Sequence, residues 1–303
     1  MFFLKEVSVV VSKSKKIKSA ELIQQFKHLF KCPICQSTIA VSELKSFKCK
    51  NNHTFDFTKQ GYLNLMVQQS NSHYDKTLFE YRHHLIVKTD FFSPLQKLIT
   101  DIIHKEKFAD DRKSLTILDV GCGEGSHLAR ILSQDGLERF TGFGLDIAKD
   151  GILQASKNYE GHVWLVGDLA KSPFADLSFQ VLLNILSPSN YKEFIRLLAP
   201  NGIVIKVIPR PSYLKELRQF FFQKQEQEEY QNENTLTLFK ENFHQVERYP
   251  LTYTKKLQTD ELRSLVNMTP LTWQASEEKI EQFIREYSAS AITVDLEVVV
   301  GKS

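Results

Sequence analysis

The sequence is short of cysteine, of net charge and of long apolar runs, and each shortage excludes a class of protein. Four cysteines in 303 residues are too few for a disulfide framework. Three of them lie within eighteen positions at a spacing typical of metal sites, so a reducing compartment is expected. Lysine and arginine exceed aspartate and glutamate by only three. The overall charge therefore indicates no polyanionic partner, and any basic surface must be local.

The sequence also lacks internal repeats, low-complexity tracts and an apolar stretch that would cross a membrane. The stretch Val7–Val11 is too short for a membrane span or for the apolar region of a secretory signal. We therefore predict a cytoplasmic protein with no export signal and no membrane anchor. The 42% of hydrophobic residues is enough to build the core of one large domain or two ordinary ones.

Changes in composition divide the chain into four predicted segments. Residues 1–30 are a lysine-rich N-terminal extension that ends in an amphipathic helix. Residues 31–65 form a compact lobe, and residues 66–76 form a polar linker around Gln68–Ser72. In residues 77–303 strands and helices alternate, which favours a parallel sheet covered by helices. The apolar positions of the N-terminal helix are Leu22, Ile23, Phe26, Leu29 and Phe30.

Seven strands are predicted from short runs of Val, Ile, Leu or Phe that are bounded by Gly, Pro, Asp or Asn. The first five are typical of strands buried on both faces of a sheet. The last strand alternates apolar and polar residues, which favours an edge position with one face exposed. The fold class is therefore α/β. The predicted strands are Thr116–Gly121, Phe140–Asp146, His162–Gly167, Phe179–Leu186, Ile203–Pro209, Val246–Thr254 and Ile292–Gly301.

The first chemical signal is a glycine-rich turn between the first predicted strand and a helix that begins near Ser126. Glycines let the backbone approach a ligand closely, and the helix N-terminus presents unpaired N–H groups to it. Asp119 precedes the turn and Glu124 lies inside it; buried acids repel phosphates but favour an amine and ribose hydroxyls. The pattern therefore favours S-adenosylmethionine over a dinucleotide, although the turn alone is also compatible with ordinary packing. The glycines are Gly121, Gly123 and Gly125.

Two further acids follow the next two predicted strands. Asp146 ends the second strand, where an acid accepts hydrogen bonds from ribose hydroxyls. Asp168 ends the third strand, where a carboxylate can accept a hydrogen bond from the adenine amino group. Ligands of open α/β sheets bind at the carboxyl edge of the strands, so these acids and Asp119 together predict a cofactor site there.

The second chemical signal is the pair Cys32-x2-Cys35, followed after thirteen residues by Cys49-x3-His53. Three thiolates and one imidazole satisfy a tetrahedral zinc ion. The protein fills all four positions, so the predicted zinc ion is structural, with one ion per chain. The alternative is a reduced lobe with buried free thiols, but so small a segment hardly folds unaided. Cys122 is interpreted as a small packing residue.

Positive charge is concentrated in the predicted zinc lobe, where five lysines face two acidic residues. We predict that these lysines track the phosphates of a nucleic acid, because the chain as a whole is nearly neutral; a solvated lysine face is the alternative. The five are Lys31, Lys45, Lys48, Lys50 and Lys59, and the aromatic residues interleaved with them, interpreted as a small core, are Phe47, Phe55, Phe57 and Tyr62.

A few residues outside the lobe are also candidates for contact with a nucleic acid. Arg82, His83 and His84 are interpreted either as an extension of the basic path or as an ordinary helix face. Tyr191 and Trp273 are candidates for stacking on a base, although such residues more often serve packing.

The motifs together resemble one family, the 23S rRNA (guanine-N1)-methyltransferases that act on hairpin 35. The resemblance covers nearly all of the chain after the N-terminal extension. It rests on Cys32–Cys35, Cys49–His53, Gly61–Leu65, Leu118–Gly125, Gly144–Asp146, Pro209–Arg218 and Met268–Trp273. Gly167–Ala170, Ser187–Tyr191 and Ile205–Pro209 are similar to the Gram-positive branch linked to macrolide (tylosin/mycinamicin) resistance, which modifies the more 3′ of two nearby guanines.

The resemblance implies a Rossmann-like, seven-stranded class I methyltransferase sheet preceded by the zinc lobe. It also implies a homodimer whose two zinc lobes flank an RNA cleft. Cofactor contacts map onto the glycine turn and onto His127 and Leu128 at the helix start. Phe92 stands where the family usually has Tyr, and Tyr213 stands where it has His, so both positions depart from the pattern.

No catalytic base is assigned from the sequence. The fourth predicted strand ends in Asn184–Pro188, which contains no carboxylate. Asn184 is interpreted either as a contact to a base edge or as a cap of the strand.

The predicted function is methyl transfer from S-adenosylmethionine to N1 of a guanine in hairpin 35 of 23S rRNA. Two other classes remain open. A small-molecule methyltransferase with a structural zinc lobe would keep the sheet and the glycine turn but has little use for a basic lobe. A non-enzymatic zinc RNA-binding protein would have a damaged cofactor site, against which the three strand-end acids argue.

Overall fold

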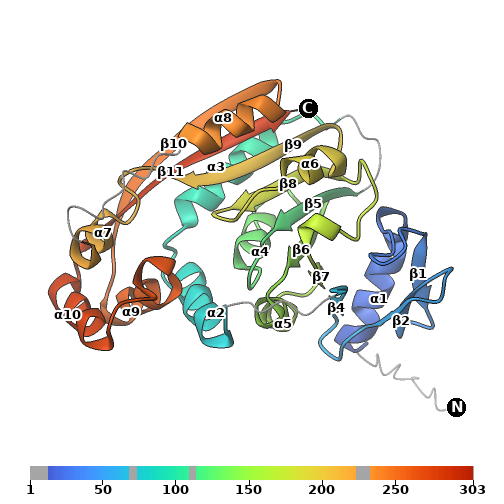
Figure 1. Ribbon diagram of the computed structural model, residues 1–303, viewed down its shortest axis with the longest axis horizontal. Coiled ribbons are helices and arrows are strands. Elements are labelled where there is room, and N and C mark those ends of the chain that lie inside the picture. The colour runs from blue at the N-terminus through green and yellow to red at the C-terminus, as the bar shows by residue number, and fades with distance from the viewer. Residues whose placement is uncertain (1–12, 68–73, 109–113, 223–232, 303) are drawn as a thin grey trace, which may run out of the picture.

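The computed structural model describes residues 13–67, 74–108, 114–222 and 233–302 (Figure 1). The stretch Val7–Val11 and the centre of the predicted linker, Gln68–Ser72, lie outside the described residues. Among the helices that are described, none is both long enough and apolar enough to cross a bilayer.

The described residues form one large sheet with the strand order β10-β11-β9-β8-β5-β6-β7-β4. All neighbours are parallel except around β11, which runs antiparallel to β9 and to β10. The chain moves outward in opposite directions from β5 and from β8, so the topological switch point lies between these two strands. The strands are β4 (Leu63–Asn64), β5 (Leu115–Val120), β6 (Phe140–Asp146), β7 (Val163–Val166), β8 (Phe179–Ile185), β9 (Leu198–Pro209), β10 (Gln245–Lys256) and β11 (Ala291–Lys302).

Each of the seven predicted strands overlaps one strand of this sheet, which confirms the α/β class and the class I methyltransferase sheet. The expected strand number was one too low, because β4 leaves the N-terminal lobe and pairs with β7 as an eighth strand. Two residues at a sheet edge carry too little pattern to be recognised in the sequence.

The predicted edge position of the last strand is wrong. β11 lies between β9 and β10 and is buried over nearly its whole length. Its alternating polar residues are buried because each has a partner: Glu216 accepts hydrogen bonds from Thr293, Arg210 pairs with Asp295, and Arg248 pairs with Glu297. Polar alternation therefore marked internal pairing and not solvent exposure. The edge of the sheet is β10, where exposed and half-buried residues alternate.

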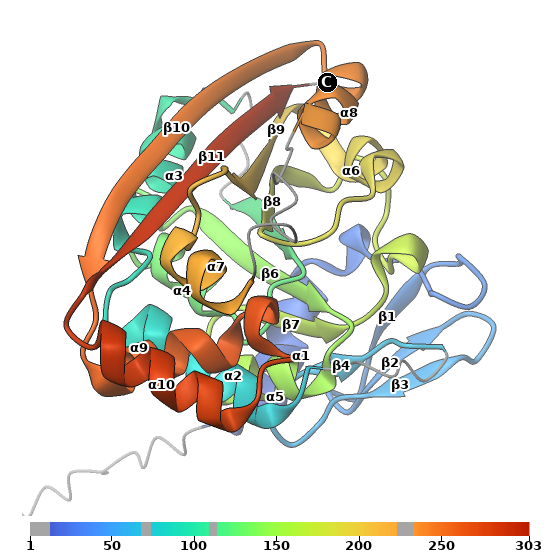
Figure 2. The same cartoon turned by 60° about the vertical axis from the view of Figure 1, so that its left-hand side comes forward.

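Helices cover both faces of the sheet. One face packs against α3 (Ser93–Lys105), α4 (Ser126–Leu132) and α5 (Lys149–Asn158). The other packs against α6 (Tyr191–Leu197), α8 (Glu233–Asn242) and the N-terminal part of the chain. Four more helices lie at one end of the molecule: α2 (Lys76–His83), α7 (Lys215–Phe221), α9 (Thr259–Met268) and α10 (Glu277–Tyr287). In Figure 2, α2, α9 and α10 lie below the sheet and α7 lies just above them. A π-helical turn, η2 (His84–Lys88), extends α2.

The N-terminal lobe lies against one flank of the sheet (Figure 1). It contains α1 (Lys15–Gln25), the short helix η1 (Lys27–Leu29) and a three-stranded sheet of β1 (Ile39–Ser42), β2 (Ser46–Cys49) and β3 (Thr54–Asp56). Its core is continuous with that of the main sheet, since the ring of Phe30 packs against Phe47 of the lobe and Phe174 of the methyltransferase part. Backbone hydrogen bonds join the two parts at Lys31 and Pro173.

Candidate functional site

The glycine turn joins β5 to α4 at the switch point of the sheet. All three predicted glycines have positive φ angles, between 59° and 78°. A side chain at Gly121 would collide with Ser187, which follows β8, and one at Gly123 would press against Phe79 of α2. The turn is therefore enclosed by the loop after β8 on one side and by α2 on the other, which only glycine permits.

The structure brings three of the predicted acids together beside this turn. Asp119 is buried in β5, and Glu124 has no exposed surface. Asp146 at the end of β6 accepts hydrogen bonds from the backbone N–H groups of Gly123 (2.8 Å) and Ala148 (2.7 Å). Asp146 thus fixes the turn as well as contributing charge.

Burial makes this cluster hard to ionise fully. Desolvation is the largest cause that raises the pKa of Asp119 to about 7; Arg82 opposes the shift, and the charges of Asp146 and Glu124 add to it. Burial also raises the pKa of Asp146. A cationic ligand would relieve the repulsion among these carboxyl groups.

Asp168 is placed differently from the other acids. It is half-buried and accepts a hydrogen bond from the Ala170 N–H at the start of the short helix η3 (Leu169–Lys171). Its charge is not among those that shift the pKa of Asp119. The structure therefore places it two residues after β7, as predicted for the end of the third strand, and the N–H of the preceding Gly167 donates to the carbonyl of Asp146.

The remaining predicted cofactor residues are buried around α4. The ring of Phe92 packs edge-on against His127 at 5.2 Å, and Leu128 lies in the core. Burial lowers the pKa of His127 well below its usual range, so its ring is neutral. Tyr213 is almost fully buried, and the charge of Arg82 acts on its hydroxyl.

Arg82 is the residue of this site that sequence reasoning missed. Its Nε atom lies 2.6 Å from the Glu124 carboxylate. His83 turns inward to Tyr159, and His84 to Ser264 of α9. The interpretation of these three residues as a basic path for RNA is therefore wrong, because their side chains are used inside the molecule.

A second unpredicted group lies behind the loop that follows β8. Lys206 of β9 is buried and donates hydrogen bonds to the side-chain oxygen of Asn184 (2.6 Å) and to the carbonyl of Ser187 (3.2 Å). Asn184 also donates to the carbonyls of Val120 and Pro188. The side chain of Asn184 therefore caps the strand, as one of its two interpretations held, and ties the loop to the end of β5.

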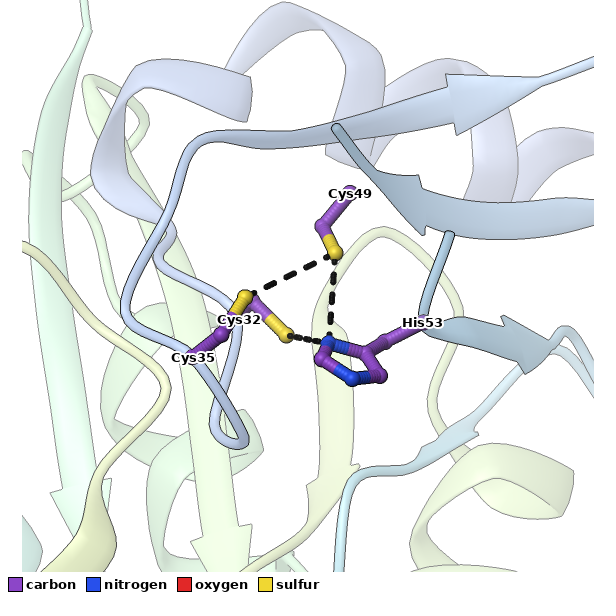
Figure 3. A group of neighbouring side chains, drawn as sticks. All are labelled: Cys32, Cys35, Cys49 and His53. Atoms are coloured by element: carbon purple, nitrogen blue, oxygen red, sulfur yellow. Dashed lines mark hydrogen bonds between the residues drawn. The ribbon is translucent and has the colours of Figure 1, made fainter. Parts of the chain in front are cut away.

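The four predicted zinc ligands converge in the N-terminal lobe (Figure 3). The Nδ1 atom of His53 lies 3.5 Å from the sulfurs of Cys32 and Cys49, and the sulfurs of Cys35 and Cys49 are 3.8 Å apart. A zinc ion with Zn–S bonds of about 2.3 Å holds tetrahedral sulfur ligands about 3.8 Å apart. The cluster therefore fits one zinc ion.

The chemistry of the donors agrees with this fit. Hydrogen bonds from the Ser37 side chain and backbone lower the pKa of Cys35 to about 5, so this residue is a thiolate at neutral pH. Thiolate is the form that binds zinc. Cys122 lies in the glycine turn, far from this set in the chain, and is buried, as its interpretation as a packing residue expects.

Comparison with known proteins connects the two sites. Residues 30–73 match the N-terminal zinc-ribbon family of RlmA, and residues 111–267 match a methyltransferase domain family. The chain is 39% identical to YxjB of Bacillus subtilis, whose name places it among 23S rRNA (guanine-N(1)-)-methyltransferases; the match covers 90% of this chain and 96% of YxjB. The chain belongs to the 23S rRNA (guanine-N1)-methyltransferase family.

A more distant relative in the same family is the 23S rRNA (guanine(748)-N(1))-methyltransferase of Streptomyces fradiae. It is 26% identical over 84% of this chain and 90% of its own length. Both parts of the molecule thus have counterparts in the family, and the family membership makes this chain an S-adenosylmethionine-dependent methyltransferase.

We predict that the purified protein contains one zinc ion per chain and that Cys49→Ser loses it, because the remaining three ligands no longer close a tetrahedron. Elemental analysis measures the zinc. Hydrogen exchange should rise in residues 31–65, while affinity for S-adenosylmethionine is largely kept, because the acids lie at the strand ends and outside the lobe. Cys122→Ala is the matched control and should retain zinc; a wild-type protein free of zinc would contradict the assignment.

We predict that affinity for S-adenosylmethionine falls as the pH drops below about 7. A cationic ligand binds the Asp119 carboxylate better than the neutral acid, so binding releases a proton and affinity is lost as Asp119 becomes protonated, by at most about tenfold per pH unit. Titration calorimetry between pH 5.5 and about 7.5 measures this dependence. Asp119→Asn should flatten the profile, and a flat wild-type profile would show that Asp119 does not face the cofactor.

Proposed function

We propose that this protein transfers a methyl group from S-adenosylmethionine to N1 of a guanine in hairpin 35 of 23S rRNA, at the more 3′ of the two family sites. The observation that carries the proposal is the match to relatives named for guanine-N1 methylation of 23S rRNA, which covers 90% and 84% of this chain and spans both the zinc lobe and the methyltransferase sheet. A small-molecule methyltransferase would need only the second of these parts.

In this proposal the cofactor lies across the carboxyl ends of β5, β6 and β7. The N-terminus of α4 and the glycine turn approach its methionine end, and Asp146 accepts hydrogen bonds from the ribose. Asp168 receives the adenine amino group, and Phe92, His127, Leu128 and Tyr213 complete the enclosure. Asp168 already accepts a hydrogen bond from the Ala170 N–H, so in this role its carboxylate bonds both the backbone and the adenine.

The chemistry needs alignment more than an acid or base of unusual strength. Guanine N1 attacks the methyl carbon as the bond from that carbon to sulfur breaks, and the N1 proton leaves to water or to a base. The buried Asn184–Lys206 group holds the loop after β8 beside the glycine turn, so this loop can form a fixed wall of the substrate pocket. We assign no residue as the base.

The zinc lobe supplies the RNA-binding surface in this proposal. Lys45, Lys48, Lys50 and Lys59 are exposed; Lys45 pairs with Glu43 at the surface, and Lys31 pairs with Asp176. Of the interleaved aromatic residues, Phe47 and Phe57 are buried in the core that the lobe shares with the main sheet, and Phe55 is half-buried against it. Tyr62 is buried in the separate core cluster that contains α3, α4 and α5. Exposed lysines on a folded support fit a phosphate backbone, which an electrostatic surface recognises without reading sequence.

An exposed aromatic pair offers a place for an unstacked base. Trp273 is 46% exposed, and its ring meets Tyr74 edge-on at 5.5 Å. The ring of Tyr74 also lies 6.3 Å from that of Phe79, and Phe79 lies against the glycine turn. By contrast, the ring of Tyr191 packs against Phe194, so Trp273 is the better of the two candidates for stacking on a base.

We also propose a division of labour and an assembly. The zinc lobe, residues 31–65, recognises RNA, and residues 77–303 bind the cofactor and carry out methyl transfer, with residues 66–76 as the linker. Two chains form a cytoplasmic homodimer whose lobes flank one RNA cleft. The lobe's fixed attachment at Lys31 and Pro173 supports such a rigid cleft wall.

We predict that replacing Lys45, Lys48 and Lys50 by Gln weakens binding to 23S rRNA fragments. The slope of log affinity against log salt should fall by about 0.7–0.9 for each phosphate group that the variant no longer neutralises. Filter binding over a salt series measures it. The matched control replaces the exposed Lys97, Lys240 and Lys256 of the main sheet's outer elements, which should leave the slope unchanged. Equal slopes for all three proteins would remove the lobe as the RNA platform.

We predict that disrupting the gene abolishes one reverse-transcriptase stop in hairpin 35. A methyl group on guanine N1 blocks the Watson–Crick edge, so the transcriptase halts one nucleotide before it. Purified protein with S-adenosylmethionine should restore the stop on RNA from the disrupted strain, and Asp146→Ala should restore it poorly, because unpaired ribose donors cost about 1–3 kcal/mol of cofactor binding.

The position of the stop separates the possible outcomes. A stop at the more 5′ guanine would overturn the proposed target while keeping the reaction. Identical stops with and without the gene, and unchanged N1-methylguanosine by mass spectrometry, would overturn the rRNA substrate. Methyl transfer to a metabolite would then identify a small-molecule enzyme, and failure to bind S-adenosylmethionine would identify a non-enzymatic RNA-binding protein.

A further inference from the structure

The ion pair between Arg82 and Glu124 leaves hydrogen-bonding atoms of both side chains without a partner among the described residues. Nε of Arg82 and the carboxylate are 2.6 Å apart, but the pair lacks hydrogen-bond geometry. Neither oxygen of Glu124 has a hydrogen-bond donor among the described residues, although the side chain is fully buried. Buried carboxylates are normally satisfied by donors, so this group is prepared for a ligand that the protein itself does not supply.

Charge in the cluster is equally unbalanced. Arg82 interacts electrostatically with Asp119, Glu124 and Asp146, so one guanidinium faces three acids. Two other basic side chains cannot meet an anionic group of a ligand. His127 is neutral, and Arg130 is bound to Asp90 and to the carbonyl of Val87. In the described part of the cluster, Arg82 is therefore the cation left to meet an anionic group.

The methionine end of S-adenosylmethionine has the complementary arrangement. Its sulfonium and α-ammonium groups are cationic, and the ammonium group has three donors. Its α-carboxylate accepts hydrogen bonds and needs a cation. A guanidinium matches a carboxylate through two parallel hydrogen bonds, which no other side chain does as well.

We propose that Arg82 binds the α-carboxylate of S-adenosylmethionine while Glu124 receives its α-ammonium group, so that Arg82 is a positioning and specificity residue of the cofactor site. In this complex Arg82 lies beside the carboxylate of the ligand and Glu124 lies beside its ammonium group. Each buried charge therefore still has an opposite charge as its neighbour. The inference rests on the cofactor and not on the RNA substrate.

The packing of α2 prepares Arg82 for this role. The side-chain oxygen of Asp75 caps the helix by accepting a hydrogen bond from the Leu78 N–H, and His84 ties the following turn to Ser264 of α9. A side-chain carbon at Gly123 would lie only 3.4 Å from Nε of Arg82. The guanidinium is thus held against the turn before the cofactor arrives, and its 20% exposure leaves it reachable.

The test compares two ligands that differ only in the carboxylate. Titration calorimetry measures the affinities of S-adenosylmethionine and of decarboxylated S-adenosylmethionine for the full-length protein without RNA. The wild type should prefer the carboxylated ligand by about 10- to 100-fold, the usual effect of hydrogen bonds to a charged group. Arg82→Met should lose this preference, and Arg82→Lys should keep part of it.

Two further variants separate recognition from folding. Lys76→Met, on the exposed side of the same helix, should keep the wild-type preference. Arg82→Met combined with Glu124→Gln removes both charges of the ion pair, so it avoids leaving Glu124 as an unpaired buried carboxylate and should fold while still lacking the preference. Thermal unfolding checks that each variant is folded.

A purely structural role for Arg82 would lower both affinities by the same factor and leave their ratio unchanged. A folded Arg82→Met protein with the wild-type ratio would therefore overturn the proposal, as would a wild type without any preference. Because no RNA is present, these results do not depend on which nucleotide the enzyme modifies. Failure of the rRNA assignment would show in the reverse-transcriptase experiment alone.

Discussion

Three carboxyl groups and one guanidinium share a space from which water is largely excluded, and the geometry of the catalytic part follows from that constraint. Burial, together with repulsion from Asp146 and Glu124, raises the pKa of Asp119 to about 7, although the charge of Arg82 opposes the shift. Such a cluster is costly to maintain unless a cation arrives. The glycine turn must fold tightly to bring the acids together, and α2 must press on that turn to bring Arg82 close.

The zinc lobe is joined to this catalytic part through a common core. Phe30 contacts rings on both sides of the junction, and β4 adds the lobe's own chain to the edge of the main sheet. A lobe so attached has a fixed orientation relative to the sheet. The zinc ion then needs only to order the local turns around its four ligands, because the phenylalanine core already sets where the lobe lies.

The sequence predicted the features whose signal is local. The glycine turn, the acids at the strand ends and the cysteine spacing each occupy a few consecutive positions, and the structure brings Asp119, Glu124 and Asp146 together and gathers the zinc ligands. Arg82 was missed because only tertiary packing brings α2 to a turn that lies forty residues later in the chain. β11 was misplaced for a related reason, since its polar residues are buried by partners such as Glu216 that no local pattern reveals.

The same electrostatics distinguish the cofactor from the product that it becomes. Methyl transfer converts the sulfonium of S-adenosylmethionine into a neutral thioether, so one positive charge leaves the acid cluster as the new bond to the nucleobase forms. In the proposed complex the ammonium group and Arg82 then face three acids and the ligand's own carboxylate, so the net negative charge of the site rises by one. By charge alone, the product lacks one Coulombic attraction that the cofactor has, and a buried site transmits such an attraction more strongly than water does. A buried pocket with excess negative charge therefore favours, on electrostatic grounds, the cationic cofactor over the product that lacks the sulfonium charge.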